Sequence, residues 1–92
     1  MTVTFSDHAE QKLTVRRIKR DEVIRVIKSP MQLFEDTEQH SSIAIEDSGS
    51  RFLIVVYRIT GEDIKAIIVY HTRKIEKLIS SKLQRKAWRK IR

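Results

Sequence analysis

Histidine, arginine, lysine and hydroxyl side chains are the chemically useful groups of this sequence. The chain contains no cysteine, which excludes thiolate nucleophiles, thiolate metal sites and disulfides. His8, His40 and His71 share no short metal-ligand spacing, and two glycines are too few for a Gly-rich phosphate loop. We therefore expect no metal ion and no other cofactor.

This set of groups suits the metal-free cleavage of RNA. In that reaction a general base takes the proton of a ribose 2′-OH, which attacks the adjacent phosphate. Cations stabilise the negative charge that develops at phosphorus, and an acid protonates the departing 5′ oxygen. DNA lacks the 2′-OH and would not be cleaved in this way.

His8 is one candidate for the base or the acid. It lies two residues into a helix that we expect to begin after Ser6, where the helix dipole disfavours an imidazolium. Asp7 and Glu10 oppose this effect of the dipole. The alternative is a structural role, in which His8 only bonds to neighbouring backbone. His40 lies in an acidic loop, and we assign it no role.

Arg58 and His71 belong to two apolar runs, residues 52–59 and 64–70, or directly follow them. These runs are rich in Val, Ile and Tyr and flank a short link that contains Gly61, which predicts an antiparallel hairpin of central strands. An arginine inside such a strand either faces solvent or a cross-strand Glu46 or Asp47, or it binds a phosphate. His71 is either a structural polar residue or part of the same catalytic site.

The positive charge is concentrated at the C-terminal end. The net charge is +7, and residues 73–92 carry nine Lys or Arg and one acid, a net charge of +8. This distribution is the footprint of a polyanion partner, RNA or DNA, although a solvated helix face is the simpler alternative. The predicted nucleic-acid-binding residues are Arg73, Lys74, Lys82, Arg85, Lys86, Arg89, Lys90 and Arg92.

The hydrophobic pattern predicts a single domain over residues 1–92, with a core at 1–72 and a basic C-terminal helix at 73–92. The predicted elements are a strand at 2–5, helices at 7–17 and 21–28, strands at 31–35, 42–46, 52–59 and 64–70, and a helix at 74–90. This order predicts an α+β fold, in which two N-terminal helices pack on one face of a twisted antiparallel sheet of about four strands.

Two regions outside the hairpin are candidates for contacts with partners. We expect the last helix to protrude beyond the sheet, which leaves Trp88 and Ile91 for a partner, or Trp88 to stack on a base or anchor the helix. Residues 35–47 hold five acids and no Lys or Arg, which predicts a protein-contact edge. Tyr57 and Tyr70 are expected to pack in the core or across strands.

A set of residues between 3 and 72 forms a motif: Phe5, Ser6, His8, Ala9, Leu13, Arg16, Ile18, Glu22, Val23, Val69 and Thr72. This motif resembles a small bacterial and archaeal domain family. Its members begin with a strand, continue with F-[ST]-x-H-A and R-x-x-R-G-I-[ST]-x-x-E-V, and end in two strands with a V-x-T-type finish. The family is usually placed among the RelE/ParE-like toxins, in the wider barnase, EndoU, colicin and RelE nuclease-like fold.

The resemblance implies a toxin-like fold with two helices and four antiparallel strands, and it makes His8 and Arg16 candidate active residues. Together with Arg58 and His71, these are our predicted catalytic residues. Arg17 stands where the family prefers glycine. Because glycine is favoured where φ is positive, we expect the turn between the two helices to differ in this chain.

We therefore expect a toxin-like, metal-independent RNA endonuclease of the mRNA interferase type, cytoplasmic and held by an antitoxin protein. The basic helix would grip RNA or the ribosome, and a homodimer could form through it. The alternatives are a non-catalytic RNA- or DNA-binding domain of the same fold, and a ParE-like toxin that acts by binding a protein target. No apolar run reaches the roughly 18 residues of a membrane span, so we expect no membrane partner.

Overall fold

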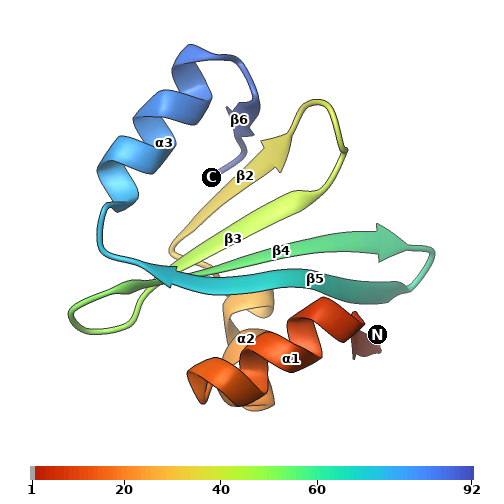
Figure 1. Ribbon diagram of the computed structural model, residues 1–92. Helices are drawn as coiled ribbons and strands as arrows, with labels where there is room; N and C mark the ends of the chain where they lie inside the picture. The colour runs from red at the N-terminus through yellow and green to blue at the C-terminus, as the bar shows by residue number, and fades with distance from the viewer. Residues whose placement is uncertain (1) are drawn as a thin grey trace.

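The computed structural model describes residues 2–92, which form three helices and one six-stranded sheet (Figure 1). The strands are β1 (Val3–Phe5), β2 (Gln32–Asp36), β3 (Ser42–Asp47), β4 (Phe52–Thr60), β5 (Asp63–Thr72) and β6 (Trp88–Lys90). The helices are α1 (Asp7–Arg16), α2 (Arg20–Lys28) and α3 (Ile75–Gln84). Within residues 2–92, no helix is both long and apolar enough to cross a membrane. The α+β class predicted from the sequence is confirmed.

The sheet is larger than expected, and it is mixed rather than antiparallel. Its strand order is β1-β5-β4-β3-β2-β6. Strands β2 to β5 pair antiparallel with one another, as the apolar runs predict, whereas β1 pairs parallel with β5. β6 pairs antiparallel with the outer side of β2. The prediction of a four-stranded antiparallel sheet is therefore wrong at both edges. There, β1 pairs with β5 and β6 pairs with β2, and each pair joins segments that are far apart in the sequence.

A β-bulge in β5 decides which side chains face which side of the sheet. The register between β4 and β5 shifts at Val56/Tyr57, which leaves Ile67 as an extra residue. An extra residue reverses the alternation of side chains beyond it. Ala66 and Val69 consequently lie in the same core, although they are three positions apart and would face opposite sides of a regular strand.

Hydrogen bonds from Ser6 connect the N-terminal segment to this bulge. Its hydroxyl donates to the Ile67 carbonyl at 2.9 Å and accepts the N–H of Ala9 at 3.1 Å, as the N-cap of α1. The backbone N–H of Ser6 donates to the Ala66 carbonyl at 2.9 Å. One residue thus ends β1, begins α1 and positions both elements against β5.

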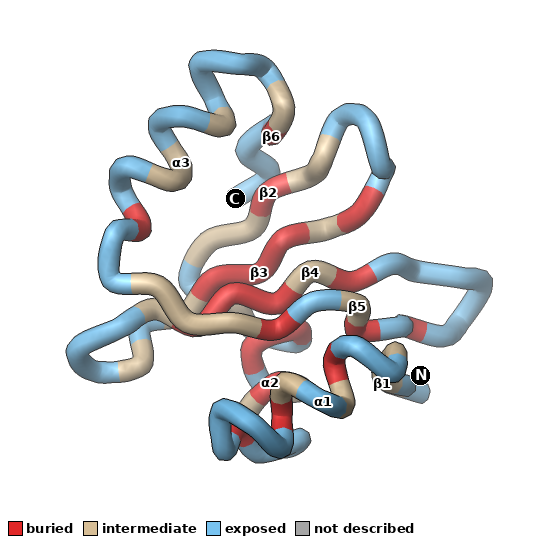
Figure 2. The backbone as a smooth tube through the Cα atoms, viewed as in Figure 1, coloured by how far each residue is buried: buried red, intermediate tan, exposed pale blue. Residues whose placement is uncertain are grey.

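Each face of the sheet carries its own core. The strands β3 and β4 contribute residues to both cores and contain long buried stretches (Figure 2). Leu53 belongs to the core under α1 and α2, together with Leu13 and Val23. Its neighbour Ile54 belongs to the core on the other face, together with Ile75 of α3. The expectation that helices pack on one face is therefore right for α1 and α2, and α3 covers part of the opposite face.

The C-terminal segment does not form the long, protruding helix that we expected. α3 ends at Gln84, and the chain turns at Lys86, whose φ is 58°, into β6. Trp88 is only 7% exposed, and its ring centroid lies 5.4 Å from that of Phe34. The Thr37 hydroxyl donates to the Lys86 carbonyl at 2.8 Å. These tertiary contacts override the local helix propensity and make Trp88 a core anchor.

The turn between α1 and α2 keeps a left-handed residue although it lacks glycine. Arg17 has φ 55° and ψ 43°, and the N–H of Ile18 donates to the Leu13 carbonyl at 3.0 Å. Ile18 and Leu13 are both buried, which completes a Schellman motif. This contact holds Arg17 in the positive-φ conformation that glycine favours.

Replacing Ser6 by alanine should lower the free energy of unfolding by about 1–2 kcal/mol, because the N-cap and the bond to the bulge are both lost. Urea unfolding followed by circular dichroism measures this change. Ser80→Ala, at an exposed position of α3, is the matched control and should change the value by less than about 0.5 kcal/mol. Equal effects of the two substitutions would contradict the role of Ser6.

Arg17→Gly should raise the free energy of unfolding by about 1 kcal/mol, since glycine adopts positive φ without the steric cost that other residues carry. Arg16→Gly, at the neighbouring helical position, should lower it by a similar amount in the same urea experiment. A destabilised Arg17→Gly variant would show that the Arg17 side chain contributes more than its backbone strain costs.

Candidate functional site

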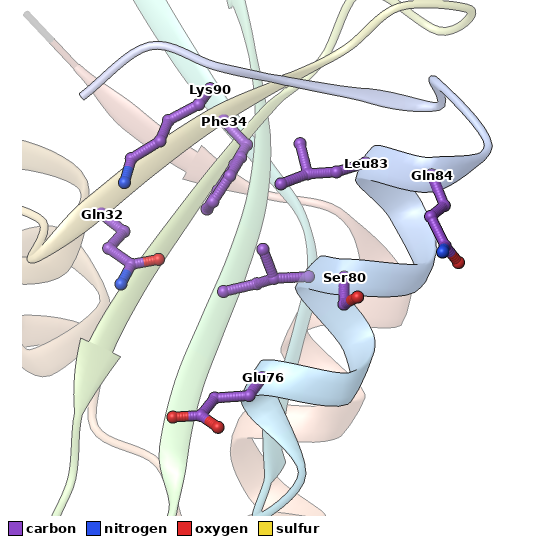
Figure 3. A pocket seen from close by; sticks show the side chains of 8 residues that line it. Gln32, Phe34, Glu76, Ser80, Leu83, Gln84 and Lys90 are labelled. Atoms are coloured by element: carbon purple, nitrogen blue, oxygen red, sulfur yellow. The ribbon is translucent and has the colours of Figure 1, made fainter.

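Helix α3 divides the sheet face opposite α1 and α2 into two grooves. On one side, two adjoining hollows of about 360 and 390 Å³ lie between α3 and the strands β3 to β5, and Tyr70 lines both. We refer to these two hollows together as the β5–α3 groove. On the other side, a groove of about 580 Å³ lies between α3 and the strands β2 and β6 (Figure 3), and we refer to it as the β6–α3 groove.

The floor of the β5–α3 groove is apolar and comes from the sheet. Ile43, Val56 and Ile68 line it from β3, β4 and β5, where they are cross-strand neighbours. Trp88 contributes an aromatic ring from β6. Aliphatic and aromatic surface of this kind suits the faces of nucleobases.

Cations from the sheet and from α3 border this floor. Arg58 extends from β4, and its guanidinium donates to the side-chain oxygen of Gln39 at 3.3 Å. Lys82 lines the same hollow from α3. Lys74 and Lys77 line the second hollow. The groove is therefore electropositive along both of its parts.

Asp36 is the only carboxylate that lines the groove within residues 2–92. Its Oδ1 accepts the N–H groups of Glu38 and Gln39 at 2.9 and 2.8 Å, which closes the turn between β2 and β3. Ser41 follows this turn, is 4% exposed and lines the same hollow. In the described chain, no group of three or more His, Asp or Glu side chains could hold a metal ion.

Tyr70 is the titratable group at the centre of the groove. Burial raises the pKa of its phenol above the ordinary value of 10.0. The side chain therefore stays protonated at neutral pH, and its O–H can donate a hydrogen bond to a ligand in either hollow.

A second polar cluster lies on the opposite face, at the end of β5. His71 pairs with Leu53, which belongs to the core under α1 and α2. The Nδ1 atom of His71 is buried and has no hydrogen-bond partner in residues 2–92. Desolvation lowers the pKa of His71 below 6.5; the charges of Arg51 and Arg16 also lower it, and that of Glu22 raises it.

A protein-family model with the description "Domain of unknown function (DUF4258)" matches residues 5–80. The chain belongs to the DUF4258 family. The matched region includes α1, α2 and the strands β2 to β5, and it ends within α3. Comparisons with curated proteins and with solved structures found no match. The wider relation to RelE/ParE-like toxins therefore stays a prediction.

The DUF4258 chain does not bring its four predicted catalytic residues together. His8 is exposed on α1, and Arg16 ends the same helix, close enough for its charge to act on His71. Arg58 lies in the β5–α3 groove, on the opposite face of the sheet. The hypothesis of one shared cleft is wrong for Arg58, because side chains of a sheet reach either one face or the other.

Arg58 also lacks the acidic neighbours that the sequence allowed. In the β3–β4 ladder, Glu46 and Asp47 pair with Leu53 and Phe52, at the far end of β4. Arg58 instead binds a neutral amide, as described above. Its charge therefore remains available to an anionic ligand.

The predicted nucleic-acid-binding residues of the DUF4258 chain divide between two surfaces. Lys74 and Lys82 line the β5–α3 groove, and Arg73 directly precedes Lys74 in the sequence. Lys77 also lines this groove and was missed, because it belonged to the same basic run without a distinguishing pattern. Arg92 is exposed at the opposite end of the segment.

The other predicted contacts lie on the turn after α3 and on β6. Arg85 and Lys86 are exposed on the turn, and Lys90 lines the β6–α3 groove. Arg89 forms an ion pair with Glu35. The single basic helix of our prediction is therefore replaced by a helix, a turn and an edge strand.

Sequence reasoning also missed the acidic turn as part of the groove. Residues 35–47 were predicted to form a protein-contact edge, but β2 and β3 are interior strands. The Asp36 carboxylate accepts the N–H of Glu38, two residues on, which is an Asx turn, and an aspartate at this position could have predicted the turn itself. That the turn faces α3 follows only from tertiary packing.

The cluster around His71 can be tested by NMR titration of its imidazole. We expect a pKa below 6.5, which Arg51→Gln should raise and Glu22→Gln should lower further, because the two charges act in opposite directions. The two variants serve as controls for each other. An unchanged His71 titration in both would contradict the placement of these charges beside it.

The same depressed pKa has a consequence for stability. As the pH falls below 6.5, the unfolded chain binds a proton at His71 before the folded chain does. His71 therefore lowers the free energy of unfolding as the pH falls from 6.5 to the lower pKa of the folded state. Above pH 6.5 it has no such effect. The His71→Gln variant should lose less stability than the wild type when urea unfolding is repeated across this interval.

Proposed function

We propose that this protein is a metal-independent, toxin-like RNA endonuclease that holds a single RNA strand in the β5–α3 groove. The observation that carries the proposal is the convergence of Arg58 from β4 and Lys82 from α3 on one hollow that also contains the Tyr70 phenol. The apolar floor of this hollow suits a base, and the two cations suit the adjoining phosphate.

The charge around the groove favours a polyanion. Four cations line it against a single carboxylate within the described residues: Arg58, Lys74, Lys77 and Lys82. Lys65, opposite Arg58 in the β4–β5 ladder, adds a further positive charge beside it. The helix α3 forms one wall of the groove, which favours a single strand over a duplex. The bases of a single strand can turn outward and stack on the groove floor.

The groove also supplies groups for cleavage. Asp36, whose Oδ1 caps the β2–β3 turn, accepts the proton of the ribose 2′-OH through Oδ2. The 2′ oxygen attacks phosphorus, and Arg58 and Lys82 stabilise the added negative charge. Tyr70 donates its proton to the 5′ oxygen as the bond from phosphorus to that oxygen breaks. The products are a 2′,3′-cyclic phosphate and a 5′-hydroxyl.

The resemblance to RelE/ParE-like toxins supports the same activity. We extend the proposal accordingly to a cytoplasmic toxin of a toxin–antitoxin system, which acts on RNA and is held by an antitoxin protein. The motif of the resemblance also points to His8 and Arg16, which lie on the α1 side together with His71. These residues define an alternative centre that the experiment below separates from the groove.

A second candidate function is RNA binding without cleavage. The observation in its favour is that none of the three histidines lines the groove in the part of the chain that the structure describes. The proposed proton transfers then depend on one carboxylate and one phenol of the described groove-lining residues. The same fold would in that case act as a binding module.

The proposal predicts that the protein cleaves labelled single-stranded RNA in the presence of EDTA and leaves DNA of the same sequence intact. Arg58→Gln should lower kcat/KM by about 10²-fold, because one cation that stabilises charge at phosphorus is removed. Gel electrophoresis measures the rate, and the resistance of the new 3′ ends to phosphatase identifies the cyclic phosphate. Cleavage by Arg58→Gln at the wild-type rate would contradict the assignment to this groove.

Two variants on the opposite side of the sheet provide matched controls. Arg16→Gln and His8→Ala should cleave at close to the wild-type rate. Loss of cleavage in these variants alone would place the reaction at the α1 side instead. RNA that is bound but stays intact would identify the binding module. In that case Lys82→Gln should remove about one phosphate contact, which lowers the magnitude of the slope of log K against log salt concentration by about 1.

A further inference from the structure

Strand β6 is an edge strand with one side unpaired. The sheet ends at β6, which pairs only with β2 among the strands of residues 2–92. The N–H of Ile91 donates to the Leu33 carbonyl at 2.9 Å. In an antiparallel ladder the alternate residues, Trp88 and Lys90, therefore direct their N–H and C=O groups away from β2. Unpaired groups of this kind are a template for another strand.

Apolar side chains border this edge on both faces of the sheet. Figure 3 shows Leu83 of α3 pointing toward Phe34 across the β6–α3 groove, and Leu83 is 40% exposed. On the other face, Ile91 is 49% exposed next to the half-buried Leu33. Because side chains alternate along a strand, one added strand would cover both Leu83 and Ile91.

The charges along the same edge are positive and largely uncompensated. Four cations at or beside β6 have no carboxylate within ion-pair distance in residues 2–92: Arg85, Lys86, Lys90 and Arg92. No acidic residue follows Glu76 in the sequence. Like charges would oppose the pairing of β6 with β6 of a second copy, whereas a strand that carries carboxylates would be attracted.

We propose that an acidic, extended segment of a partner protein adds to β6 as a further strand of the sheet. Its backbone pairs with Trp88 and Lys90, its carboxylates lie beside Lys90 and Arg92, and its apolar side chains enter the β6–α3 groove over Leu83. RNA would satisfy the cations but not the row of backbone donors and acceptors, so the edge favours a peptide. This surface lies on the other side of α3 from the β5–α3 groove and does not depend on the proposed RNA function.

Fluorescence anisotropy with two short labelled peptides tests this proposal on the full chain. In one peptide pairs of valines alternate with pairs of glutamates, so that each face of the added strand carries both apolar and acidic side chains. In the other peptide lysines replace the glutamates. We expect the glutamate peptide to bind at least about tenfold more tightly, because only its charges complement those of the edge. Equal binding of the two peptides would overturn the preference for an acidic partner.

A matched pair of variants separates strand addition from charge attraction. Lys90→Pro removes the outward N–H but leaves the ladder to β2, whereas Lys90→Val removes the same charge and keeps the N–H. The glutamate peptide should bind Lys90→Pro about tenfold more weakly than Lys90→Val. Equal binding of the peptide by the two variants would overturn strand addition.

Hydrogen exchange gives a second readout on the unaltered chain. In the saturated peptide complex, the N–H groups of Trp88 and Lys90 should exchange at least about tenfold more slowly than in the free protein. Unchanged exchange at both positions would overturn the proposal. If Lys90→Pro weakens the binding of single-stranded RNA but not of the glutamate peptide, the edge belongs to nucleic acid and the proposal is also overturned.

Discussion

The carbonyl of Ile67 accepts the Ser6 hydroxyl at the point where β5 carries one residue more than β4. Because of this extra residue, Ala66 and Val69 face the same core, and Ile68 is turned to the opposite side. The bond from Ser6 holds β1 and α1 at the same place. The two-sided character of the molecule, with a helical layer on one face and the β5–α3 groove on the other, therefore depends on one bulge and the hydroxyl that binds it.

The strand end beyond this bulge carries two titratable groups in contrasting surroundings. Burial favours the neutral form of both Tyr70 and His71. It therefore raises the pKa of the Tyr70 phenol and lowers the pKa of the His71 imidazole. Cations near His71 strengthen this effect on the α1 side. The result is a protonated phenol in the groove and a readily deprotonated imidazole behind it, from adjacent residues of one strand.

The C-terminal segment determines how the positive charge is distributed. Trp88 packs on Phe34 and turns the chain back into the sheet, so the cations of this segment do not share one helix face. Those of α3 border the β5–α3 groove, and those of the turn and of β6 border an open sheet edge. A single α3 helix thus separates the groove that we propose for a nucleic acid from the edge that we propose for an acidic peptide.

The sequence by itself determined the local elements, because apolar periodicity and the Ser6 cap act within a few residues. It predicted α1, α2, the β4–β5 hairpin and the α+β class, and it located the positive charge. Only the tertiary structure decided the bulge, the parallel pairing of β1, the existence of β6, the end of α3 and the face on which each polar residue lies. These features depend on contacts such as that of Trp88 with Phe34, which join residues far apart in the chain and outweigh local propensity. For the same reason, Arg58 and His71 could be named from the sequence, but their separation by the sheet could not.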